Sequence, residues 1–143
     1  MNVSIKSIPQ KDQRYPTIGD WWEENGEMKI RVSEELGNED YILMIAVHEL
    51  IEQHLCRKRG ITQEMVDKFD NEHLDVDDPG LLPNAPYHKE HLFALIVEGM
   101  LANQLEVDFT YNGAYNNKLG EVCPSEPNSK GESKSMFEGS QDV

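Results

Sequence analysis

His48, Glu49 and Glu52 are ionisable residues inside an otherwise apolar segment, in the run Val-His-Glu-Leu-Ile-Glu-Gln-His at residues 47–54. An α-helix turns about 100° per residue, so His48 and Glu52, four positions apart, lie about 40° from each other on one face. Burying an unpaired charge is costly, and such a group normally needs a charged partner or a metal ion. The spacing therefore indicates a metal site, or else a core histidine hydrogen-bonded to a carboxylate.

The run His48-Glu49-x-x-Glu52 differs by one residue from H-E-x-x-H, in which two histidines one turn apart bind zinc and the glutamate is a general base. Glu49 points about 100° away from His48 on the helix, as that base does. Bound zinc lowers the pKa of a water to about 7, and a nearby carboxylate can then take its proton. We expect His48 and Glu52 to be metal ligands and Glu49 to be a catalytic base.

A second group of ionisable residues lies in segment 86–106. His91 and Glu98 are seven positions apart, within about 20° of each other on a helix, and they lie beside alanines rather than charged residues. His88 and His91 form an i, i+3 pair that could approach one ion or could simply be a polar helix start. Because a catalytic zinc commonly has three protein ligands, we expect His91 to be the third, with His88 and Glu98 as reserve ligands or supporting groups. The apolar side of this helix should be its packing face; it consists of Leu92, Phe93, Ile96, Val97 and Met100.

The elements that position these residues can be predicted from the hydrophobic pattern. Residues 3–33 contain alternating runs and an Asn25-Gly26 pair, which is typical of a hairpin, so we expect a small antiparallel sheet. Helices are expected at about 39–59, 62–70 and 86–106, the first of them buried between two layers. The fold class is thus α+β, with a single domain over 1–110 and a disordered tail over 111–143 that is rich in polar residues.

An acidic segment separates the second and third helices. It lacks the spacing and the terminal glutamate of an EF-hand, so we interpret it as a solvated loop. Its acidic residues are Asp70, Glu72, Asp75, Asp77 and Asp78.

The chain has 143 residues and a formal net charge of −14, with 13 basic and 27 acidic residues. This balance argues against nucleic acid or an anionic membrane as the main partner, since both require clustered basic residues. The two cysteines form no C-x-x-C motif, and the N-terminus has no apolar signal segment. We therefore expect a cytosolic protein; the sequence gives no oligomeric state.

Four blocks in this chain resemble a family of small proteins encoded by phages and prophages, over residues 3–109. They are Gln-Arg-Tyr-Pro-Thr-x-Gly-Asp-Trp (13–21), Ile-Arg-Val-Ser (30–33), Val-His-Glu-Leu-Ile-Glu (47–52) and Ala-Pro-Tyr-His-Lys-Glu-His (85–91). The resemblance implies a phage-encoded protein in the host cytosol.

A looser resemblance is to minimal zincins, in which a sheet precedes an active-site helix bearing His-Glu. It implies that His48 and Glu52 are the helix ligands and Glu49 the catalytic glutamate. The chain departs from that pattern where Glu52 replaces the second histidine, and an anionic ligand there would make zinc less Lewis-acidic and favour Mn or Fe.

The leading hypothesis is a zincin-like, metal-dependent hydrolase, with zinc as the first choice of ion, acting on a peptide or protein. One alternative is a non-enzymatic, acidic phage accessory protein that binds a host or defence protein. Another is a metal-dependent hydrolase of nucleotides or phosphoesters, which would need two metal ions and more carboxylate ligands.

Overall fold

A tight hairpin forms the N-terminal sheet. Strand β2 (Gly19–Glu24) pairs antiparallel with β3 (Glu27–Ser33), and Asn25 and Gly26 between them have positive φ angles of 53° and 76°. Positive φ at both turn positions matches the right-handed twist of the strands and is why Asn-Gly favours this turn. The predicted hairpin is confirmed.

We had expected an antiparallel sheet, but the sheet is mixed. Strand β1 (Val3–Ile8) runs parallel to β3, and the strand order is β1-β3-β2. The chain leaves β1 through a short 3₁₀ turn, η1 (Gln10–Asp12), and crosses to the far edge before the hairpin returns it through the centre. Alternation of apolar and polar residues indicates a half-buried strand, but it does not indicate which strand is its neighbour. The sequence therefore could not predict that β1 runs parallel to β3.

Three helices follow the sheet in the order that the sequence predicts. Helix α1 (Glu39–Lys58) begins at Asn38, whose side chain accepts a hydrogen bond from the Asp40 backbone N–H. Helix α2 (Gln63–Glu72) begins in the same way at Thr62. Helix α3 comprises residues His88–Leu105. Two further 3₁₀ turns, η2 (Glu34–Leu36) and η3 (Pro79–Leu81), precede α1 and α3 respectively.

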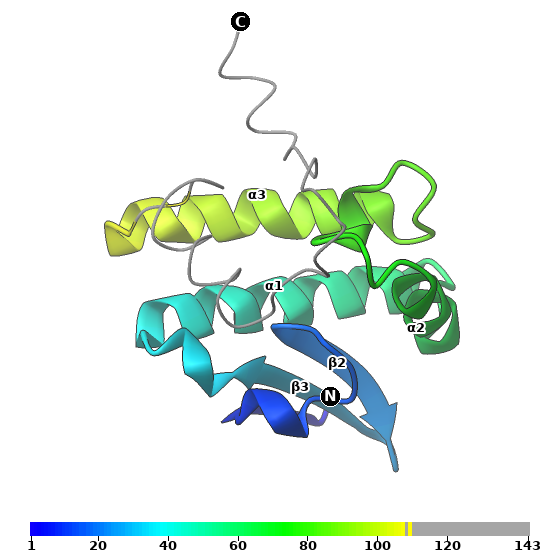
Figure 1. Cartoon of the computed structure of the whole chain (residues 1–143), viewed down its shortest axis with the longest axis horizontal. Coiled ribbons are helices and arrows are strands. Elements are labelled where there is room, and N and C mark those ends of the chain that lie inside the picture. Colours follow the sequence, from blue (N-terminus) through cyan, green and yellow to red (C-terminus); the bar gives the residue numbers. More distant parts are fainter. Residues whose placement is uncertain (108, 110–143) are drawn as a thin grey trace, which may run out of the picture.

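Helix α1 is the middle layer of the molecule. In this computed structural model, which describes residues 1–107 and 109, the sheet packs on one side of α1 and α3 on the other (Figure 1). The prediction of a helix buried between two layers is therefore confirmed, as is the α+β class. On the sheet side the core consists mainly of apolar residues, among them Trp21, Met28, Ile30, Val32 and Ile45.

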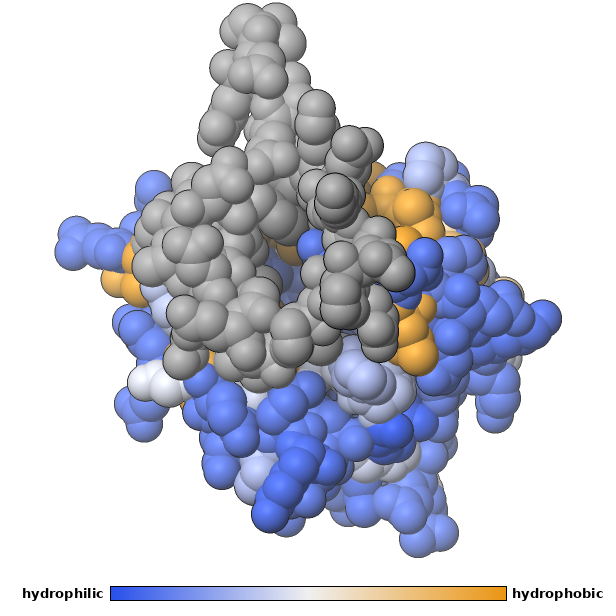
Figure 2. Space-filling view, in the orientation of Figure 1, coloured by the Kyte–Doolittle hydropathy of each residue, from blue (hydrophilic) through white to orange (hydrophobic). Residues whose placement is uncertain are grey.

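Helix α3 packs through a different face from the one that its apolar residues suggested. Phe93, Ile96 and Met100 are 50%, 47% and 65% exposed, whereas the small residues Ala94 and Ala102 are buried. Among the described elements, α3 packs mainly against α1, and it turns its ionisable face towards that helix. Hydrophobic side chains consequently reach a surface that is otherwise largely hydrophilic (Figure 2).

The predicted disordered tail, residues 111–143, lies outside the described residues. Among the residues that are described, none of the helices has the length and apolarity needed to cross a membrane.

Candidate metal centre

Three ligand-type atoms from α1 and α3 meet in the interior. His48 Nε2 lies 3.1 Å from Glu52 Oε2 and 3.1 Å from His91 Nδ1. His91 Nδ1 lies 2.8 Å from the same Glu52 oxygen. The three residues are only 4%, 4% and 8% exposed. They are the three ligands that the sequence analysis ranked first, and we call them the His48–Glu52–His91 cluster.

The second polar atom of each cluster residue is held by another side chain. His48 Nδ1 lies 2.8 Å from Glu98 Oε2, and His91 Nε2 lies 2.9 Å from Asp78 Oδ1. The indole N–H of Trp21 donates to Glu52 Oε1 at 3.1 Å. Histidines that bind metals almost always donate their other ring N–H to a carboxylate, a carbonyl or water, which fixes both the ring orientation and the tautomer. Both cluster histidines have such a carboxylate.

The contacts with Glu98 and Asp78 determine which ring nitrogens of His48 and His91 carry a hydrogen. If His48 donates its Nδ1–H to Glu98 and His91 donates its Nε2–H to Asp78, each neutral ring presents a bare lone pair to the other. The third atom, Glu52 Oε2, is also an acceptor. Three lone pairs then face one another with no hydrogen between them, so the cluster needs a cation: either extra protons on the imidazoles or a metal ion.

The spacing of the three atoms suits a small divalent metal ion. Ligand atoms placed 2.0–2.1 Å from a tetrahedral zinc are separated from one another by about 3.3 Å. The observed separations of 2.8–3.1 Å are shorter by a few tenths of an ångström, which small side-chain rotations would supply. Two imidazole nitrogens and one carboxylate oxygen are also a donor set that catalytic zinc uses.

Without a metal, protons take that place. Burial alone would lower the pKa of His91, but the charge and hydrogen bond of Asp78 and the hydrogen bond of Glu52 raise the pKa to about 10. Burial also works against protonation of His48, yet hydrogen bonds to Glu52 and Glu98 raise its pKa well above the usual value. The metal-free cluster is therefore a network of imidazolium and carboxylate groups at neutral pH, and a metal would have to displace protons from it.

Glu49 lies next to the cluster on the side of strand β2. A Cβ atom on Gly19 would lie 2.6 Å from Glu49 Oε1, so the absence of a side chain at Gly19 makes room for this carboxylate. Burial, and then the negative charge of Glu52, raises the pKa of Glu49 well above its ordinary value. Its carboxylate accepts no hydrogen bond from the described residues. A half-buried carboxyl with a raised pKa and a free oxygen is suited to accepting and returning a proton.

His88 is placed apart from the cluster. Its Nδ1 lies 2.9 Å from the carbonyl oxygen of Gly80 in η3, so this histidine anchors the loop that precedes α3. The same glycine contacts the cluster, because a Cβ on Gly80 would lie 2.5 Å from His91 Cγ. The structure thus brings His48, Glu52, His91 and Glu98 together and leaves His88 outside.

Asp78 is a site residue that sequence reasoning missed. We had grouped it with the solvated acidic loop, but its carboxylate contacts His91, whose charge lowers the pKa of Asp78 even though burial opposes this. Asp70 is also not solvated, because it accepts hydrogen bonds from the hydroxyls of Tyr15 and Tyr87. The available signal for Asp78 was its position directly before Pro79-Gly80, a tight turn leading towards the histidine-bearing helix.

Comparison with protein-family models, with curated proteins and with solved structures gave no match, so the centre is interpreted from its own geometry.

Proposed function

We propose that this protein is a metal-dependent hydrolase that binds one divalent ion through His48 Nε2, His91 Nδ1 and Glu52 Oε2. The observation that carries the proposal is the convergence of three acceptor atoms whose partner atoms are all fixed by other side chains. Zinc fits the donor set best, and Mn or Fe are the next choices because one ligand is anionic.

In the proposed hydrolysis, the metal ion and Glu49 have separate roles. A zinc ion held by three protein ligands supplies an open position and lowers the pKa of a water there. Glu49 holds the proton taken from that water and delivers it to the leaving group. Its freedom from hydrogen bonds to the described residues supports this assignment, because a carboxylate already saturated with donors is a weak base.

The substrate class that we propose is an amide bond in a peptide or in an extended segment of a protein. The two carboxylates that contact the cluster histidines, Glu98 and Asp78, are already engaged by the imidazoles. A two-metal phosphoesterase would need such carboxylates as bridging ligands, so the geometry favours the one-metal alternative. The low exposure of the ligands favours a narrow, extended substrate over a folded surface.

The second candidate function is a non-enzymatic accessory protein that binds another protein, and the outer face of α3 favours it. Phe93, Ile96 and Met100 form an exposed apolar stripe at helical spacing, which is unusual on a chain of this charge. In either case we propose a phage-encoded protein that works in the reducing host cytosol, where the buried free thiol of Cys56 would persist.

Elemental analysis of protein purified without a chelator or a histidine tag tests the metal centre. We expect about one equivalent of metal per chain. The double variant His48→Ala/Glu52→Ala should contain none, while His54→Ala, which removes an exposed histidine from the same helix, should keep the full amount. A metal-free wild type that takes up neither zinc, manganese nor iron would eliminate the proposal.

Glu49→Gln then separates an enzyme from a metal-binding accessory protein. We expect this variant to keep its metal and its melting temperature but to lose peptide hydrolysis by roughly 10²–10⁴-fold, the usual contribution of a general base. If a metal-loaded wild type cleaves no member of a peptide library, the accessory function is the better assignment.

A further inference from the structure

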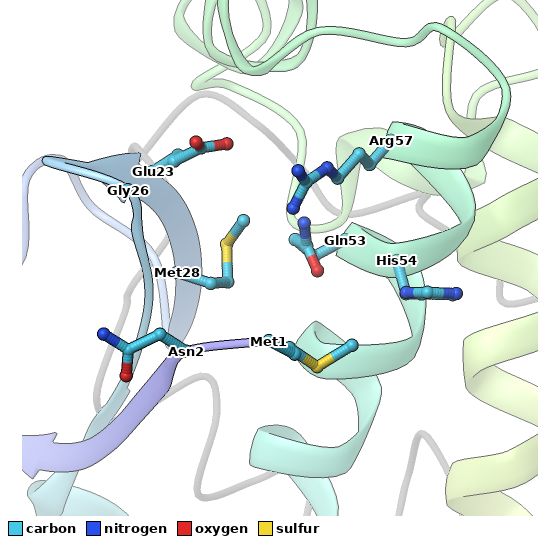
Figure 3. Close-up of a pocket in the computed structure, with 8 residues that line it drawn as sticks. All are labelled: Met1, Asn2, Glu23, Gly26, Met28, Gln53, His54 and Arg57. Carbon is cyan, nitrogen blue, oxygen red and sulfur yellow. The ribbon is translucent and has the colours of Figure 1, made fainter.

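A separate cavity of about 400 Å³ lies where the tip of the β2–β3 hairpin faces the C-terminal half of α1. Figure 3 shows Glu23 and Met28 on the strand side, and Gln53 and Arg57 on the helix side. The cavity shares no lining residue with the His48–Glu52–His91 cluster. Its volume falls in the range of roughly 300–1,000 Å³ that small-molecule sites occupy.

Gln53 is the first sign that this cavity binds something. Its side chain is only 4% exposed, yet its amide makes no hydrogen bond to any of the described residues. The amide lies beside the Met28 side chain and the Arg57 guanidinium (Figure 3). The Gln53 amide is not fully enclosed and Gln53 lines the cavity, so its donor and acceptor atoms are available to a ligand there.

The two walls carry opposite charges. Arg57 forms no ion pair within the described part of the chain, whereas Arg14 and Arg59 each pair with a carboxylate. An unpaired arginine is notable in a chain with 27 acidic and 13 basic residues. On the facing strand, the Glu23 carboxylate is likewise without an ion pair among these residues, although the Glu23 backbone N–H donates to Gln63.

An apolar surface lies between the charges. Two methionines line the cavity: Met28, which is 5% exposed, and Met1, which is 95% exposed. Methionine side chains are flexible and polarizable, so they adapt to apolar groups of different shapes. A ligand that satisfied every wall would carry a carboxylate, an ammonium group and an apolar side chain.

We propose that this cavity binds a small zwitterion: an α-amino acid with an apolar side chain, or a short peptide of such residues. Arg57 binds the carboxylate, Glu23 binds the ammonium group, Gln53 orients the backbone atoms and Met28 contacts the side chain. The proposal is independent of the metal centre and of hydrolysis.

Calorimetric titration of the full chain, carrying any tag at its C-terminus, tests the chemistry of the ligand. Leucine and leucyl-leucine should bind, while N-acetyl-leucine and leucinamide, which each lack one charge, should bind at least about tenfold more weakly. Tighter binding of leucine would identify a free amino acid as the ligand, and tighter binding of leucyl-leucine a peptide. If none of the four binds at millimolar concentration, or if all bind equally, the proposal is wrong.

Charge-neutral variants then test the assignment of each wall. Arg57→Gln should abolish the preference for leucine over leucinamide, and Glu23→Gln the preference for leucine over N-acetyl-leucine. Both residues are exposed, so neither change threatens the fold. Lys58→Gln makes the same charge change as Arg57→Gln at an exposed residue that does not line the cavity, and it should leave binding unaltered. An equal effect of Lys58→Gln and Arg57→Gln would show general electrostatics and overturn the assignment.

Discussion

The two interfaces of helix α1 are built on opposite principles. Towards the sheet, α1 packs on apolar side chains such as Ile30 and Val32, which are completely buried. Towards α3, buried histidines and carboxylates pair with one another. Hydrophobic burial is non-directional and tolerates small shifts, whereas a buried charge cluster is stable only when every partner is in place. The interface with the sheet therefore stabilises the fold, and the interface with α3 fixes the positions of the histidine and carboxylate side chains.

The largest expected effect comes from breaking the apolar interface. Ile30→Ala should lower the free energy of unfolding by about 2–5 kcal/mol, because it leaves a cavity at the centre of the sheet. The affinity for metal should change less than the stability, because the three cluster residues lie on α1 and α3 whereas Ile30 lies on β3. Urea unfolding with and without zinc measures both quantities. A loss of metal affinity comparable to the loss of stability would show that the two interfaces are not independent.

A pH dependence is the next largest effect and belongs only to the polar interface. With its pKa of about 10, His91 is protonated at neutral pH in the metal-free protein. Burial opposes protonation of His48, but hydrogen bonds to Glu52 and Glu98 raise its pKa, so this ring also holds a proton more tightly than a free imidazole. Metal binding must release these protons, so affinity should rise by about tenfold to a hundredfold per pH unit between about pH 6 and pH 8. Calorimetry in buffers of different ionisation enthalpy counts the protons. An affinity independent of pH would contradict the proton network.

Neutralising Glu98, which contacts His48, tests the polar interface of α1 by itself. Glu98→Gln keeps the shape of the side chain that holds His48 but loses its charge, and we expect metal affinity to fall by about 10–100-fold. Glu106→Gln, which removes the same charge from an exposed residue just beyond α3, is the matched control. Competition with a chelator measures both variants, and equal affinities would remove Glu98 from the centre.

The sequence predicted the helix bounds and the residues of the His48–Glu52–His91 cluster better than it predicted strand pairing. Caps and glycines are local signals, so α1 begins at residue 39 as expected and ends one residue before the predicted end. His48, Glu52 and His91 were recognisable because charged groups on an apolar helix face conflict with burial. The direction of β1 and the partner of Asp78 depend on chain segments distant in sequence, and neither leaves a local pattern.

The smallest expected effect concerns Asp70, which lies outside both interfaces. Burial, assisted by the charges of Glu52 and Asp78, raises the pKa of Asp70 to about 6 despite hydrogen bonds from Tyr87 and Tyr15. The folded state therefore keeps a proton that the unfolded state releases near pH 4, and the stability from this group is lost as pH rises through about 6. Asp70→Asn should remove that loss, on the order of 1 kcal/mol once residual solvent contact is considered. Urea unfolding at about pH 5 and about pH 7 compares the two proteins, and parallel pH profiles would contradict this prediction.

The parallel pairing of β1 also has a consequence for the order in which the chain folds. The β2–β3 hairpin closes through a two-residue turn, and hairpins of this kind form in about 1–10 μs. Residues 9–26 separate β1 from its partner β3, so closing this longer loop costs more entropy than closing the hairpin turn. The strand edge to which β1 binds also exists only after the hairpin has formed. We expect β1 to dock last and to open first. Its amides should then exchange with deuterium faster than those on the hairpin side of β3, although all three strands belong to one sheet.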